Sequence, residues 1–198
     1  MLSVGPGVFI PRPETESLLD WAMKQTLPRQ PYVVDLCTGS AALAVAMARH
    51  WPDARVVAVD NSTAALDYAR RNAVGTRVEL VEGDVTDPAL LPDLDAHVDL
   101  VVANPPYLPD DAQVEPEVAE HDPRPALFGG PDGMGVIAPI VRLAGRLLRP
   151  GGVIAVEHDE TTSAATVELF SAAGVFDEIT PHKDLVGRPR FVTARRAS

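Results

Sequence analysis

Short apolar runs alternate with amphipathic stretches along most of the chain. Strands are predicted at Tyr32–Leu36, Arg55–Asp60, Arg77–Val81, Val98–Ala103 and Val153–Glu157. Helices are predicted at Ser40–His50, Ser62–Asn72, Met134–Leu148 and Thr161–Ala173. Continuous apolar strands that alternate with helices form parallel sheets covered on both faces. The pattern therefore predicts a doubly wound, mostly parallel α/β fold, and two later β-like runs, Phe176–Pro181 and Pro189–Ala194, predict a terminal pair of strands.

The N-terminal residues 1–13 are rich in glycine and proline and predict an extended lead-in. Pro13 suits the first turn of a helix, because the N–H that proline lacks would have no helical partner there. Glu14 and Glu16 complement the positive end of that helix, and Pro28 is expected to end it. We find no internal repeat and no composition change that would mark a boundary, so we expect one domain over residues 1–198.

About 30 residues, 104–133, separate a predicted strand from the next helix without a convincing element of their own. Connections of that length are uncommon in compact domains and are often functional. A disordered insertion is the alternative. Tyr107, Leu108, Leu127 and Phe128 argue against it, because a fully solvated loop has no need of such apolar side chains.

The composition, with 46% hydrophobic and 23% charged residues, is that of a soluble globular protein. No apolar run is long enough to span a bilayer, and the first residues lack the basic and apolar regions of a signal peptide. Cys37 is the single cysteine, so no internal disulfide can form and a cytoplasmic location is expected.

The net charge of −11 argues against DNA as a partner. Proteins that grip nucleic acid through its phosphates usually carry a basic stripe. Here the positive side chains gather only near the C-terminus, at Lys183, Arg188, Arg190, Arg195 and Arg196. We therefore expect no DNA partner. We also expect no membrane partner and a monomeric protein.

Acidic residues stand at the carboxyl ends of three successive predicted strands. Asp35 leads into the turn Cys37-Thr38-Gly39-Ser40-Ala41, whose small side chains would let a ligand approach the backbone at the start of a helix. Asp60, followed by Asn61, stands 25 residues beyond Asp35, where a carboxylate can accept hydrogen bonds from a ribose diol. Asp84 could bind an adenine amino group, and Val85 could pack on the ring. Each acid alone could be a solvated strand end, but together they predict a nucleotide-type cofactor site at the carboxyl edge of the sheet.

The fourth strand ends in Asn104-Pro105-Pro106-Tyr107, here called the tetrad. An amide or aromatic amine is a poor nucleophile because its lone pair is delocalised. The Asn104 side-chain oxygen and the Pro105 carbonyl could accept hydrogen bonds from its N–H groups, and two prolines would fix that carbonyl. Tyr107 could stack on the planar group and align it with a methyl donor. A proline-stiffened turn with no catalytic role is the alternative.

The tetrad resembles that of amino-methyltransferases acting on adenine, cytosine or glutamine nitrogens. Further stretches narrow the resemblance to the release factor glutamine methyltransferase family. These are Phe9–Glu16 (FIPRPETE), Glu117–Asp122, Arg124–Gly133 (RPALFGGPDG), Leu148–Gly152 (LRPGG) and Asp184–Arg190 (DLVGRPR).

The resemblance implies a seven-stranded, Rossmann-like class I methyltransferase sheet with an antiparallel last strand. It implies S-adenosyl-L-methionine as methyl donor and the glutamine of the Gly-Gly-Gln motif in peptide chain release factors as acceptor. By motif, residues 37–41, Asp60 and Val85 would contact the cofactor, Asn104 both cofactor and substrate, and Pro105, Pro106 and Tyr107 the glutamine.

The chain departs from the family pattern at three positions. Cys37 and Ala41 stand where the family turn usually has glycine, and Asp159 stands where a glycine is expected after Glu157-His158. A methyl group at Ala41 could crowd the cofactor or tighten the helix start. The family's helical substrate-binding domain, which precedes the lead-in, is expected to be absent.

Two other functions fit the same residues. The first is an adenine-type nucleic-acid or small-molecule amino-methyltransferase, and the second is a cofactor-binding module that no longer catalyses. The five histidines show no metal-ligand spacing, so no metal is expected. Glu157 could belong to the site or simply end its strand.

Overall fold

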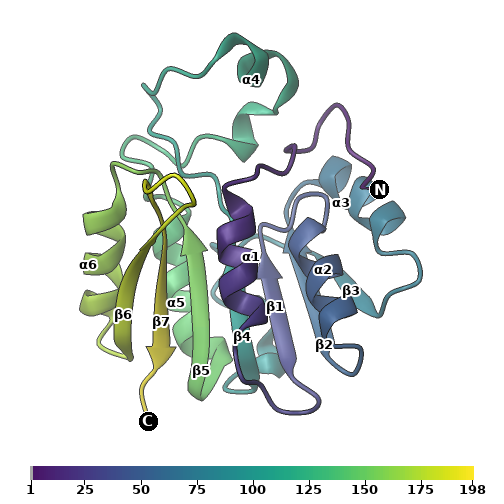
Figure 1. Cartoon of the computed structure of the whole chain (residues 1–198), viewed down its shortest axis with the longest axis vertical. Helices are drawn as coiled ribbons and strands as arrows, with labels where there is room; N and C mark the ends of the chain where they lie inside the picture. Colours follow the sequence, from purple (N-terminus) through teal and green to yellow (C-terminus); the bar gives the residue numbers. More distant parts are fainter. Residues whose placement is uncertain (1) are drawn as a thin grey trace.

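The computed structural model describes residues 2–198 and confirms the α/β fold: one seven-stranded sheet lies between two layers of helices (Figure 1). The strands are β1 (Tyr32–Leu36), β2 (Arg55–Asp60), β3 (Val78–Glu82), β4 (Val98–Ala103), β5 (Leu148–Glu157), β6 (Phe176–Lys183) and β7 (Pro189–Arg196). The helices are α1 (Thr15–Met23), α2 (Ala42–His50), α3 (Thr63–Asn72), α4 (Pro116–His121), α5 (Ile137–Leu147) and α6 (Ser163–Ala173).

The strands lie in the order β3-β2-β1-β4-β5-β7-β6. The first five strands pair in parallel, whereas β7 runs antiparallel to both β5 and β6. This confirms the expected sheet with an antiparallel last strand. Within residues 2–198, no helix is both long and apolar enough to cross a membrane.

The apolar faces of the sheet explain why both helical layers form. Alternate residues of β1, β2 and β4 point to opposite faces. On one face Val33, Val56 and Leu100 pack against α1, α2 and α3. On the other face Val34 and Val57 pack in a cluster with α5 and with Phe170 of α6. Helix α1, predicted to extend to Pro28, ends at Met23.

Strand β5 begins at Leu148, five residues earlier than the hydrophobic pattern predicted. Leu148 pairs with Val98, and the register then shifts before Leu100 pairs with Val153. This shift in register accommodates Arg149–Gly152, whose proline and two glycines are typical of a turn. Pairing with β4, not local propensity, therefore sets where this strand starts.

Residues 104–133 carry more structure than the sequence indicated. They contain α4, a 3₁₀ turn at Arg124–Ala126 and a bridge between Leu108 and Phe128. The expectation that this segment has no convincing element was therefore wrong. Helix α4 has only six residues, too few for a clear helical period, and its position depends on contacts with distant residues.

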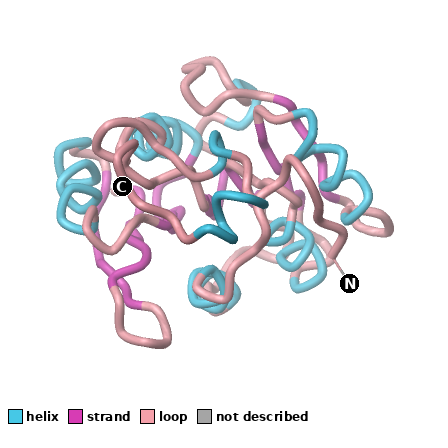
Figure 2. Tube along the Cα trace, turned by 90° about the horizontal axis from the view of Figure 1, so that it is seen from above, coloured by secondary structure: helices cyan, strands magenta, loops and turns pink. Residues whose placement is uncertain are grey.

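The lead-in supplies those contacts. Its Arg12 forms an ion pair with Asp122, whose side chain is fully buried, and the Ile10 N–H donates to the same carboxylate at 3.0 Å. Nearer the N-terminus, the Ser3 N–H donates to the Asn72 side chain at 2.7 Å. Seen from above, the segment with α4 lies over the middle of the molecule (Figure 2). The lead-in and α4 together form a roof above the carboxyl edge of the sheet.

Two glycines let residues 129–135 pack directly against the tetrad. A Cβ atom at Gly129 would lie 2.6 Å from the Pro106 carbonyl oxygen, and one at Gly133 would lie 2.2 Å from that of Tyr107. Neither position accepts a larger side chain unless the backbone moves. Gly130, between them, has a left-handed φ of 95°, but a Cβ there would have nothing within 4 Å.

Gly133→Ala should therefore destabilise the protein more than Gly130→Ala. Both alanines would adopt a left-handed backbone, at roughly 1–2 kcal/mol. The Gly133 variant must also displace the Tyr107 carbonyl, and overpacking adds about 1–3 kcal/mol. Urea unfolding of the two variants beside the parent chain measures the difference. Equal losses would show that the contact with Tyr107 is not a packing constraint.

Candidate functional site

A cavity with a volume of about 480 Å³ opens where β1, β2, β3 and β4 end. Its floor consists of the turns after these four strands, and its roof comes from the lead-in and α4. The register explains the convergence: Leu36 pairs with Val59 on one side and with Ala103 on the other. The residues that follow these three therefore begin side by side.

The turn after β1 has an unusual backbone. Cys37, Gly39 and Ala41 all have left-handed φ angles, of 58°, 55° and 63°. Such angles favour glycine and cost other residues about 1–2 kcal/mol each. Cys37 and Ala41 are the two positions where the family pattern has glycine. Both residues adopt the left-handed backbone that glycine favours, at a cost in strain energy. The Ala41 methyl group packs into the core beside α2 and does not line the cavity.

Asp35 holds this turn from inside. Its carboxylate accepts hydrogen bonds from the Thr38 hydroxyl at 2.6 Å and from the Ala44 N–H at 3.1 Å. Asp35 is 1% exposed, and its second oxygen has no partner among the described residues. Burial raises the pKa of Asp35 to about 7, the nearby charge of Asp60 adds to the rise, and the two hydrogen bonds oppose it.

Asp60 ties the first turn to the second. It accepts the Gly39 N–H at 2.8 Å and the Ser62 N–H at 2.9 Å, and burial raises the pKa of its carboxyl group. The helix-start donors that the sequence suggested for a ligand are thus partly occupied, since Ala44 and Gly39 donate to carboxylates. Each carboxylate oxygen can still accept a further hydrogen bond from a ligand.

Asp84 stands in the third turn and is exposed. The Thr86 N–H and then the Thr86 hydroxyl lower the pKa of Asp84, so this carboxylate is ionised. Asn61 donates to it at 3.3 Å. The buried Val85 beside it lines the cavity with an apolar surface. A charged acceptor next to an apolar wall suits a flat ring with an amino group.

The tetrad forms the fourth part of the floor. The Asn104 side-chain nitrogen donates to the Thr15 hydroxyl at 3.1 Å, which leaves the amide oxygen free to accept. The backbone N–H groups of Tyr107 and Leu108 both donate to the Leu127 carbonyl, at 3.1 and 2.9 Å. The far end of the long segment therefore fixes the tetrad.

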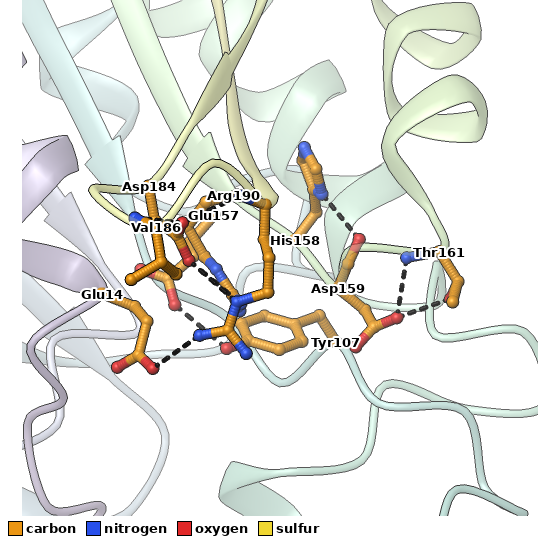
Figure 3. A network of polar contacts seen from close by, with 10 residues as sticks. Glu14, Tyr107, Glu157, His158, Asp159, Thr161, Asp184, Val186 and Arg190 are labelled. Carbon is orange, nitrogen blue, oxygen red and sulfur yellow. Dashed lines mark hydrogen bonds and ion pairs between the residues drawn. The ribbon is translucent and has the colours of Figure 1, made fainter.

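The Tyr107 hydroxyl points toward Glu157, the last residue of β5, as Figure 3 shows, and donates to it at 3.0 Å. Glu157 is 1% exposed and lies behind the cavity, not among its lining residues. Burial raises the pKa of Glu157 to about 7, against the opposing effects of Thr15, Tyr107 and Arg190. Burial also raises the pKa of Tyr107, so its hydroxyl remains protonated and donates.

The structure brings together all predicted site residues except Ala41. The cavity is lined by Asp35, Cys37, Thr38, Gly39, Ser40, Asp60, Asn61, Asp84, Val85, Asn104, Pro105, Pro106 and Tyr107. The sequence did not identify the roof residues Arg12, Thr15 and Val118, although Arg12 and Thr15 stand within the lead-in motif. In residues 2–198, no group of three or more His, Cys, Asp or Glu side chains could hold a metal ion.

The hydrogen-bond acceptors that line the cavity fit a cationic nucleoside. Three carboxylates, of Asp35, Asp60 and Asp84, line one side, and an oxygen of Asp35 is buried without a partner. A positively charged ligand would satisfy that oxygen and offset the cost of burying the charge.

A family model described as a methyltransferase domain matches residues 33–120. A release factor glutamine methyltransferase from Mycolicibacterium smegmatis is 66% identical over 195 residues, which cover 98% of this chain and 69% of that protein. One from Mycobacterium tuberculosis is 63% identical over 200 residues, covering 99% of this chain and 66% of that protein. The chain thus spans about two thirds of the length of these relatives.

A relative from Streptomyces pristinaespiralis, a 4-amino-L-phenylalanine/4-methylamino-L-phenylalanine methyltransferase, is 47% identical over 178 residues, covering 86% of this chain and 60% of that protein. Among solved structures, a methyltransferase from Pyrococcus furiosus superposes with a TM-score of 0.67 at 19% identity, covering 100% of this chain and 89% of that chain. That likeness concerns the fold alone. The relatives' identity over nearly the whole chain shows that it belongs to the release factor glutamine methyltransferase family.

Proposed function

We propose that this chain transfers a methyl group from S-adenosylmethionine to the side-chain amide nitrogen of a glutamine in the Gly-Gly-Gln motif of peptide chain release factors. The observation that carries this proposal is the position of the tetrad, which faces a cavity lined by three carboxylates. Membership of the family supports the choice of acceptor.

The cofactor would lie along the turns after β1, β2 and β3. Asp60 is suited to a ribose diol, Asp84 and Asn61 to an adenine amino group, and Val85 to the face of the ring. Asp35 and the turn Cys37–Ser40 would surround the amino-acid end. A bound cofactor would supply a methyl group on a sulfonium. The acceptor nitrogen would gain an N–C bond, the S–C bond would break with its electron pair left on sulfur, and the nitrogen would lose one proton to water.

The tetrad would hold the acceptor. The free oxygen of Asn104 and the Pro105 carbonyl can accept both N–H bonds of a primary amide, which directs the nitrogen lone pair away from them. The Tyr107 ring, anchored by its hydroxyl, offers a flat face against which the amide plane can stack. Because these groups are placed before the substrate arrives, the protein contributes mainly orientation and exclusion of water.

A small-molecule arylamine is a second candidate acceptor. The relative from Streptomyces pristinaespiralis, whose name specifies such a substrate, favours it. An arylamine shares with glutamine a planar, delocalised nitrogen, so the tetrad alone does not distinguish them. The higher identity to the glutamine methyltransferases favours the protein acceptor. A nucleic-acid acceptor is disfavoured by the acidic composition.

Incubation of the chain with a release factor and S-adenosylmethionine tests the proposal. Mass spectrometry of peptides should show the mass of one added methylene group on the Gly-Gly-Gln glutamine. A release factor with glutamate at that position is the control and should stay unmodified. Modification of 4-amino-L-phenylalanine with no change in the release factor would support the second candidate instead.

Tyr107→Ala should slow methyl transfer while leaving cofactor affinity nearly intact. Mispositioning of the acceptor by about 1 Å can cost on the order of a hundredfold in rate. Single-turnover kinetics at saturating cofactor give the rate, and calorimetric titration gives the affinity. Weak cofactor binding with a normal rate at saturation would place Tyr107 in the cofactor pocket and contradict its assigned role.

The affinity for S-adenosylmethionine should rise as the pH increases to about 7 and then level off. The pKa of Asp35 is raised to about 7 by burial, and a net positive ligand binds its ionised form better. Affinity should change by up to about tenfold per pH unit below this pKa. In the ligand-free protein the free energy of unfolding should instead fall as the pH rises from about 4 to 7. The unfolded chain releases the Asp35 proton near pH 4, whereas the folded protein keeps it until about pH 7.

Calorimetry of Asp35→Asn across the same pH range should give a nearly flat affinity. Glu157→Gln is the matched control, because Glu157 also has a pKa raised to about 7 but does not line the cavity. It should keep the pH dependence of the parent chain. A slope that survives in Asp35→Asn would assign the titration to another group.

A further inference from the structure

Glu157 is a buried carboxylate for which the proposed reaction has no use. It ends β5, beside the Ala103 end of β4, and lies behind the cavity. A carboxylate that is 1% exposed is costly to keep, and an apolar residue would end the strand without that cost. Its surroundings must therefore account for its presence.

Glu157 is linked by hydrogen bonds to Tyr107 and Asn104, the two tetrad side chains proposed to face the substrate. One oxygen accepts the Tyr107 hydroxyl at 3.0 Å. The Thr15 hydroxyl faces the same carboxylate and favours its charged form, while Thr15 also accepts the Asn104 side-chain nitrogen at 3.1 Å. Glu157 is thus in direct contact with Tyr107 and is linked to Asn104 through Thr15.

Charged side chains from β7, from the loop before it and from the residue before α1 surround this carboxylate (Figure 3). The positive charge of Arg190, from β7, lies near both Glu157 and Tyr107. Asp184 pairs with Arg190 at 3.7 Å, and Glu14 adds a second negative charge before α1. Among the described residues, one oxygen of Glu157 and the Arg190 Nε are both buried without a hydrogen-bond partner. The hydroxyl groups of Tyr107 and Thr15, and not Arg190, therefore orient the carboxylate.

We propose that Glu157 is a positioning residue that holds the Tyr107 ring in the orientation needed to stack on the acceptor amide. Methyl transfer to glutamine is the proposed function on which the kinetic part of this inference rests. The hydrogen bond fixes the far end of the ring, and the Leu127 carbonyl fixes the Tyr107 backbone. Together they leave the ring little freedom, although it lies on a loop and not on a strand.

A spectroscopic test is independent of turnover. The chain has three tyrosines, so ¹³C-labelled tyrosine gives few NMR signals, and Tyr107→Phe assigns the one of interest. Glu157→Ala should shift and sharpen the Tyr107 ring signal as the ring becomes more mobile. Glu157→Gln, whose carbonyl can still accept the hydroxyl, should keep a signal close to that of the parent.

Asp99→Asn is the matched control for the loss of a buried carboxylate. Asp99 lies in β4, within the same sheet but away from the cavity, and is 4% exposed. It accepts hydrogen bonds from the Tyr32 N–H and the Arg149 side chain. The variant should leave the Tyr107 signal unchanged. An equal change in this variant would mean that the effect reflects general loosening of the fold, and the proposal would fail.

The kinetic test uses a release factor as acceptor. Glu157→Ala should lower the single-turnover rate by roughly ten- to a hundredfold with cofactor affinity nearly unchanged, and Glu157→Gln should recover most of that rate. Tyr107→Phe keeps the ring but loses the hydroxyl. Added to Glu157→Ala, it should cause little further loss, because both changes remove the same hydrogen bond.

The outcomes separate the two proposals. If the parent chain does not modify a release factor, the proposed function fails and the NMR arm alone decides the role of Glu157. A Tyr107 signal unaltered by Glu157→Ala overturns the inference whatever the activity. A signal that changes while the rate does not, in an active parent, also overturns it, because the held orientation would then not matter.

Discussion

The parallel hydrogen-bonded pairing of β2, β1 and β4 is the constraint on which the site depends. Parallel strands end at one edge, and the register sets Val59, Leu36 and Ala103 level with one another. Asp60, Cys37 and Asn104 therefore begin adjacent turns, although they are far apart in the sequence. A shift of one residue in either pairing would move these side chains out of line and turn alternate residues to the opposite face.

Carboxylates at this edge stabilise the turns before any ligand binds. Asp35 accepts the Thr38 hydroxyl of the first turn and the Ala44 N–H of α2, whereas Asp60 accepts one N–H from the first turn and one from the second. The same burial that makes these bonds effective raises the pKa of both acids. Hydrogen bonds thus hold the turn in place, and the electrostatic cost of burying these two carboxylates favours a cationic ligand. The left-handed backbone at Cys37 and Ala41 adds strain that the hydrogen bonds of this turn offset.

The roof and the tetrad depend on contacts between distant segments. Asp122 brings α4 to the lead-in through Arg12 and Ile10, and Gly133 allows the chain to return against Tyr107. Glu157 then contacts Tyr107 from behind the cavity. The acceptor-facing side of the site is consequently built from three regions: the lead-in, the loop after β4 and the end of β5.

The sequence by itself determined the alternating α/β order, the bounds of β1, β2 and β4, and the residues of the cavity floor. It could do so because buried parallel strands are continuous apolar runs, and because Asp35, Asp60 and the tetrad stand at or directly after the carboxyl ends of such runs. The early start of β5, helix α4 and the roof were decided only by the tertiary structure. Leu148 becomes a strand residue because Val98 lies beside it, and the six residues of α4 are positioned through Asp122. The tertiary structure also decided that Ala41 faces the core and that Glu157 meets Tyr107, because hydrogen bonds between residues fifty positions apart leave no periodic trace in a sequence.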